Sequence, residues 1–100
     1  MNDVLYRDVV GCKIARNGVD LPIVMCEAPA YSGLTEGDVV VIDIGYMMAT
    51  STVTSVRTEP LNGPSVTFGR VLKTVVYTPF DWSSIDEERK GRGVVESEKA

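Results

Sequence analysis

Residues 34–58 constrain the fold of this chain more than any other stretch. They read as an acidic glycine turn, a dense apolar run over residues 39–44, and a long segment rich in Thr, Ser and Val after the Gly-Tyr pair at 45–46. A short apolar run bounded by turn residues is typical of a β-strand that is covered on both sides. A two-residue loop with glycine first favours a type II′ turn, and this turn pairs Ile42 with Ala49. The stretch therefore predicts a β-hairpin.

A second hairpin is predicted around the Asn-Gly pair at 17–18, because both central residues of a type I′ turn need positive φ. With a two-residue loop, Cys12 lies opposite Ile23 and Cys26 lies opposite Val9. The two cysteines then face opposite sides of the sheet, where they cannot reach disulfide geometry. We therefore expect two free thiols.

Two later strands carry interruptions. Val53 and Val56 break the strict alternation of the long strand, which predicts either a β-bulge near Thr54 and Ser55 or a strand that leaves one face for the other. Residues 66–77 read as the last strand, and Gly69 within it predicts a bend or bulge at which a small barrel turns its corner.

The sequence divides into a small β-barrel domain, residues 1–80, and a C-terminal polar segment, residues 81–100. Within the polar segment, Ser84 and Glu87 have the spacing of a capping box. Acidic residues followed by basic ones suit the helix dipole, so we expect a short helix that runs through Lys90. The residues after it hold too little apolar surface to dock, and we expect them to fray.

Five strands with almost no helix between them predict an all-β fold. The first choice is a small five-stranded SH3-like barrel, partly open, or a strongly twisted sheet, followed by the short helix. An OB-like barrel is the alternative. It normally carries a helix between its third and fourth strands, whereas only residues 58–65 separate them here.

Charge and composition exclude several classes of function. The formal net charge is −4 without clustered Lys or Arg, which argues against a nucleic-acid partner. There is no apolar run long enough to span a bilayer and no signal peptide pattern at the N-terminus, so we expect a cytoplasmic protein with no membrane partner. Histidine is absent and the two cysteines lack metal-ligand spacing, so we expect no metal, no cofactor and no enzymatic activity.

Residues 34–53 resemble a pattern found in several small barrels: a leucine, a short acidic turn, Gly37-Asp38, a Val-rich strand, a tight turn and a further strand. The layout of residues 4–77 is similar to the N-terminal DNA-binding domain of the primosomal helicase PriA. It is equally similar to small uncharacterised barrel proteins of phages and mobile elements, which implies a bacterial or phage genome. The resemblance implies a barrel that Leu34 plugs at one end. Since this chain lacks the basic cluster of the helicase domain, we carry over the fold and no binding residue.

Two groups of residues are candidate binding sites. Tyr77, Phe80 and Trp82 form the densest aromatic cluster, which either contacts a partner or closes one end of the barrel and anchors the C-terminal segment. The alternative site is a positive groove for nucleic acid, built from the basic residues Arg57, Arg70 and Lys73. Arg70 and Lys73 have odd spacing, which places them on opposite faces of a strand unless a bulge shifts the register.

We therefore expect a non-enzymatic barrel that acts as an interaction or assembly module, with a nucleic-acid-binding barrel as the alternative. A strand edge left open in a small barrel can pair with a second copy or accept a strand from a partner protein. Pro22 blunts one edge, so the strand at residues 66–77 is the favoured one for such pairing.

Overall fold

The computed structural model describes residues 4–14, 19, 21–76 and 79–90 of the 100-residue chain. The strands are β1 (Tyr6–Ile14), β2 (Ile23–Pro29), β3 (Val39–Asp43), β4 (Met48–Pro60) and β5 (Gly69–Thr74). A helix spans residues 83–90. The prediction of a small all-β barrel with a short C-terminal helix is confirmed.

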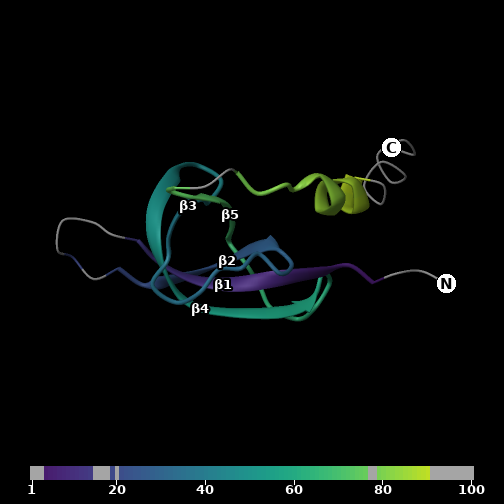
Figure 1. The fold of residues 1–100 in the computed structure, drawn as a ribbon, viewed down its shortest axis with the longest axis horizontal. Coiled ribbons are helices and arrows are strands. Elements are labelled where there is room, and N and C mark those ends of the chain that lie inside the picture. The colour runs from purple at the N-terminus through teal and green to yellow at the C-terminus, as the bar shows by residue number, and fades with distance from the viewer. Residues whose placement is uncertain (1–3, 15–18, 20, 77–78, 91–100) are drawn as a thin grey trace.

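The five strands close into a barrel in the order β1-β2-β5-β3-β4 (Figure 1). All neighbours are antiparallel except β2 and β5, which are parallel and joined through only two residue pairs, Cys26 with Gly69 and Glu27 with Arg70. The barrel is closed rather than partly open, and its last strand is shorter than the predicted residues 66–77. Because β5 lies between β2 and β3, the segment 61–68 must cross from β4 to the far side of β1 and β2.

The hairpin between β3 and β4 has the predicted register. Ile42 pairs with Ala49, and the Ile44 amide donates to the Met47 carbonyl oxygen at 3.0 Å. Gly45 has a φ of 100°, the positive value that the first central residue of a type II′ turn requires. The glycine determines this turn locally, which explains why the sequence predicts it correctly.

The predicted register of the hairpin between β1 and β2 is wrong by one residue. Cys26 pairs with Val10 rather than Val9, and Cys12 pairs with Val24 rather than Ile23. Since side chains alternate between faces, this shift brings both cysteines to the same side, where both are fully buried in the core. The thiols are free, as predicted, but the reason given for it was wrong. The predicted turn at 17–18 lies outside the described residues.

Bulges interrupt two strands. Gly11 pairs with Ser55 and the next residue of β1 pairs with Val53, so Thr54 is the extra residue that the broken alternation predicts. A second shift occurs between β3 and β5 at Leu72 rather than at Gly69. Gly69 serves a different purpose: a Cβ there would lie 2.5 Å from the Asp43 carbonyl oxygen, so only glycine allows this close approach.

The barrel interior is filled by small and medium apolar side chains. They are Val10, Cys12, Cys26, Ala28, Leu34, Val40, Ile42, Val53 and Val71. Leu34 comes from the loop between β2 and β3 and is 6% exposed. This loop residue therefore contributes to the core in addition to the strands.

The C-terminal segment packs on the barrel. Trp82 and Ile85 are buried. Asp81 Oδ1 accepts hydrogen bonds from the amide and hydroxyl of Ser83, so the helix begins before Ser84 and the predicted capping box is wrong. Over the described residues, no helix has the length and apolar character needed to cross a membrane.

Candidate functional site: an open strand edge over a buried ionic network

The second half of β4 has an unpaired edge. Residues 48–52 pair with β3 on one side, whereas residues 51–60 pair with β1 on the other. Val53 still exchanges hydrogen bonds of 2.8 Å with Gly37 and Asp38. From Thr54 to Pro60, no strand in the described part of the chain covers the side of β4 that faces away from β1, where the two strands run on beyond the barrel (Figure 1).

The alternation of the ladder identifies the free backbone groups on this edge. The Leu61 amide donates to the Leu5 carbonyl oxygen at 2.8 Å, so every second residue before it also bonds to β1. The amide and carbonyl groups of Val56 and Thr58 therefore point away from β1. Pro60 follows at the next such position and has no N–H, so it ends the edge as proline commonly does on exposed strands. The open edge is thus short and well defined.

Arg57 lies between these two residues and points to the outer face of the barrel. Its Cα pairs with that of Val9 on β1, and its side chain is 64% exposed. The guanidinium contacts the Ser65 hydroxyl and lies 3.5 Å from Glu59 Oε1. Most of its charge is therefore presented to solvent beside the open edge.

Behind Arg57 lies a buried ionic network on the outer face of β1, β2 and β4. Arg7, only 5% exposed, bonds Glu27 Oε2 at 2.8 Å and Glu59 Oε2 at 3.1 Å. The same guanidinium donates to the Ser65 carbonyl oxygen at 2.6 Å and to the Thr67 hydroxyl at 3.4 Å. The segment 61–68 thus lies over β1 and is held there by Arg7.

The network extends to the helix through Arg89. Its two terminal nitrogens bond the two carboxylate oxygens of Glu27 at 2.5 and 2.9 Å. Burial alone would raise the pKa of Glu27, but the hydrogen bonds from Arg89 and Arg7 outweigh it, and the pKa falls below its usual value. Glu27 therefore stays ionised and ties the helix to β2.

Asp8 organises the opposite, inner side of the same strands. It is 2% exposed and accepts hydrogen bonds from the Thr58 hydroxyl at 2.6 Å, the Ser32 hydroxyl at 2.6 Å and the Tyr31 amide at 3.2 Å. Burial raises its pKa, but the bonds from Ser32 and Thr58 prevail and lower it. One buried carboxylate therefore links the edge residue Thr58 to the loop that follows β2.

Tyr31 is held by this carboxylate in an unusual conformation. Its φ is 58°, in the left-handed region that residues other than glycine seldom adopt, and its side chain is left 79% exposed. Such backbone strain persists where neighbouring bonds impose it and is enriched at binding sites. The Tyr31 side chain lines a hollow of about 330 Å³ together with Leu5, Tyr6 and Ile85 and no residue of β4, so Tyr31 is a candidate contact residue separate from the edge.

The predicted aromatic cluster is only partly an open surface. Trp82 is 8% exposed, its Nε1 donates to the Val71 carbonyl oxygen at 3.0 Å, and the Arg70 guanidinium lies 4.0 Å from its ring. Phe80 packs against the core. Trp82 and Phe80 therefore anchor the C-terminal segment, which is the structural alternative of the two roles predicted for this cluster. The third predicted residue, Tyr77, lies outside the described residues.

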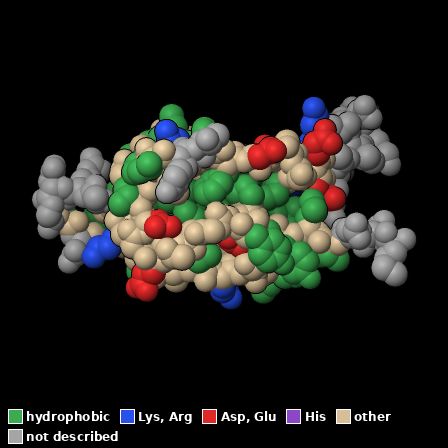
Figure 2. All heavy atoms as spheres, viewed as in Figure 1, with side chains coloured by type: hydrophobic (Ala, Val, Ile, Leu, Met, Phe, Trp, Pro, Cys, Tyr) green, Lys and Arg blue, Asp and Glu red, His purple; other side chains and the backbone are tan. Residues whose placement is uncertain are grey.

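The predicted basic residues do not form one groove. The bulge at Leu72 turns both Arg70 and Lys73 outward, because they pair with the outward-facing Asp43 and Val41. Arg70, however, is bonded to Asp86 at 3.0 Å, and its strand is not adjacent to β4, since β3 lies between them on one side and β1 and β2 on the other. On the face seen in Figure 2, basic and acidic side chains are scattered singly rather than gathered in a positive patch.

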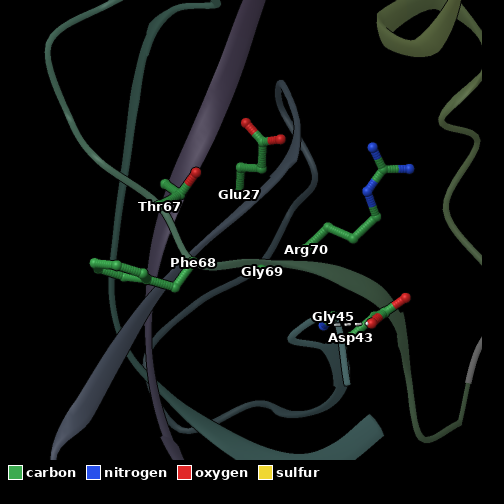
Figure 3. A pocket seen from close by; sticks show the side chains of 7 residues that line it. All are labelled: Glu27, Asp43, Gly45, Thr67, Phe68, Gly69 and Arg70. Carbon is green, nitrogen blue, oxygen red and sulfur yellow. Dashed lines mark hydrogen bonds between the residues drawn. The ribbon is translucent and has the colours of Figure 1, made fainter. Parts of the chain in front are cut away.

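A hollow of about 340 Å³ lies beside the start of β5 and is lined by Glu27, Asp43, Gly45, Thr67, Phe68, Gly69 and Arg70 (Figure 3). Phe68 points away from Glu27 and Arg70, so aromatic and charged groups do not converge. Both oxygens of Glu27 are bonded to arginines, and Asp43 Oδ1 accepts from the Gly45 amide at 2.8 Å. Among the described residues, no cluster of three metal-ligating side chains occurs. Glu27 and Asp43, the two acids that line this hollow, are therefore both engaged in hydrogen bonds within the protein.

Comparisons with protein-family models, with curated proteins and with solved structures find no match to this chain. The fold and the site define a small closed β-barrel with an open edge on its longest strand. Sequence reasoning missed Arg7, Asp8 and Glu27, although charged residues inside predicted strands were a signal that could have identified them.

Proposed function

We propose that this protein is a non-enzymatic interaction module that accepts an extended segment of a partner protein as an additional strand on β4. The observation that carries the proposal is the unpaired edge between Thr54 and Pro60. Strand addition derives affinity from backbone hydrogen bonds, which the groups of Val56 and Thr58 can supply. The edge differs from the predicted one at residues 66–77, because β5 is paired on both sides within the closed barrel.

The edge is preorganised for this purpose. Pairing with β1, the bond from Thr58 to Asp8 and the Arg7 network each hold the backbone of β4 before a partner arrives. A rigid receiving strand loses little conformational entropy on binding, so more of the hydrogen-bond energy appears as affinity. We place the module inside the cell, a setting supported by two core cysteines that remain free thiols.

A display library of random eight-residue peptides tests the proposal, with wild type as bait and two variants as counter-screens. Val56→Pro removes the N–H that points away from β1. Val56→Thr is the control, because it keeps this N–H while it also replaces the valine side chain that packs against the core. We expect selected peptides to bind wild type and Val56→Thr but not Val56→Pro. We also expect them to slow amide exchange at Val56 and Thr58. Peptides that bind Val56→Pro equally well, or that protect other amides only, would show that the edge is not the receptor.

A further inference from the structure

We infer that the β4 edge selects a segment of another protein with the pattern apolar–acidic–apolar, rather than a second copy of this chain. The inference rests on the proposed strand addition and specifies its partner. Side chains of an added strand alternate between the outer face, where Arg57 lies, and the inner face, where Val56 and Thr58 lie. Each face therefore sets its own requirement.

The outer face requires a negative charge. Arg57 is 64% exposed at the middle of the edge, directly beside the position that the central residue of an added strand would occupy. The nearby acid on β4, Glu59, lies 3.5 Å from Arg57, but its side chain is almost buried and it also bonds Arg7 and, at 2.7 Å, the Ser65 hydroxyl. Arg57 is thus the charge that an incoming strand meets, and an Asp or Glu complements it.

The inner face requires apolar side chains. Val56 packs partly against the core, and the Thr58 hydroxyl is engaged by Asp8, which leaves the methyl group of Thr58 for contact. The residues before and after the acidic one would therefore meet the apolar parts of Val56 and Thr58.

A second copy of the chain does not meet these requirements. Antiparallel self-pairing centred on Arg57 sets two arginines directly opposite each other, an arrangement that destabilises cross-strand pairs. The register that sets Arg57 opposite Glu59 of the other copy gains little, because that carboxylate already lies 3.1 Å from Arg7 and 3.5 Å from Arg57 of its own chain. Charge complementarity therefore favours a different, acidic chain.

Three capped nine-residue peptides test the inference by NMR titration of the full chain. Their central residues are Val-Asp-Val, Val-Lys-Val and Thr-Asp-Thr within otherwise identical Thr and Ser sequences. We expect wild type to bind the Val-Asp-Val peptide about two- to fivefold more tightly than Val-Lys-Val, the range of one exposed cross-strand charge pair. The Arg57→Glu variant is expected to reverse this order. The Thr-Asp-Thr peptide is expected to bind more weakly than Val-Asp-Val to both proteins.

The outcomes separate the two proposals. Equal binding of the Asp and Lys peptides to wild type, with both lost in Val56→Pro, would overturn the acidic preference and leave strand addition intact. No binding of any peptide, together with random-library binders that ignore Val56→Pro, would remove strand addition itself. A concentration-dependent dimer in sedimentation equilibrium that Val56→Pro abolishes would identify a second copy as the occupant and overturn the inference.

Discussion

Replacing Arg7 with methionine is the most direct test of what holds the outer face together. The substitution keeps much of the aliphatic volume but removes the guanidinium that bonds Glu27 at 2.8 Å, with side chains only 6% and 7% exposed. Removing one partner of a buried ion pair typically costs about 3–5 kcal/mol, because the remaining charge is left desolvated. Arg89 still compensates Glu27 in part, so we expect a loss at the lower end, about 3 kcal/mol.

A loss of that size is large for this chain. A domain of about 100 residues loses roughly 4–8 °C of melting temperature per kcal/mol, so we expect Arg7→Met to melt about 12–24 °C lower than wild type. The matched control is Arg57→Met, which removes the same chemical group from the same cluster at a 64% exposed position. An exposed pair contributes about 0–1 kcal/mol, so the control is expected to melt within a few degrees of wild type.

Urea unfolding monitored by circular dichroism at pH 7 and at pH 4 measures both variants. We expect the difference between Arg7→Met and wild type to shrink at the lower pH, because the carboxylates left behind can then take up protons. A loss below about 1 kcal/mol at pH 7, or one equal to that of Arg57→Met, would refute the reasoning that Arg7 neutralises desolvated charge.

Three further predictions follow from single contacts. Folding lowers the pKa of Glu27, so the unfolded chain takes up a proton at a higher pH than the folded chain does. We therefore expect this contribution to stability to be complete above the ordinary pKa of a carboxylate and to be lost as the pH falls towards the folded pKa. The melting temperature measured as a function of pH tests this, and a flat profile would contradict it. Gly69→Ala is expected to lower the free energy of unfolding by about 1–3 kcal/mol in urea, because the new Cβ would lie 2.5 Å from the Asp43 carbonyl oxygen. Gly33→Ala is the control, because Gly33 has a φ of 80° and a Cβ there would meet nothing within 4 Å. It is expected to cost only the strain of the left-handed conformation, about 1–2 kcal/mol. Trp82→Phe loses the indole hydrogen bond to β5 and is expected to cost about 1 kcal/mol, and no measurable loss would show that this bond does not anchor the C-terminal segment.

The ionic network on the outer face and the free edge of β4 have different roles. The outer network is a stability element, since its carboxylates are bonded by Arg7 and Arg89 and enclosed by the segment 61–68. The edge next to it keeps its backbone groups and Arg57 available to solvent. A protein can retain buried ionic groups to fix a specific arrangement even when apolar side chains would stabilise it equally well. Here the arrangement they fix is the path of β4.

The sequence alone determined the all-β class, the β3–β4 hairpin, the bulge at Thr54 and the short C-terminal helix. Each of these depends on local chemistry, such as the positive φ at Gly45 or the break in alternation between Val53 and Val56. Local patterns decide such features because the groups that interact are within a few residues of each other.

Only the tertiary structure decided the register of β1 and β2 and the location of the open edge. One residue of difference in the first loop reverses which side Cys26 faces, and no local preference outweighs the need to bury both cysteines and Val10 in one core. Closure of the barrel then pairs β5 on both sides and leaves one side of β4 unpaired over residues 54–60. Which edge remains free depends on how all five strands are ordered, and that order arises from contacts between residues far apart in the chain.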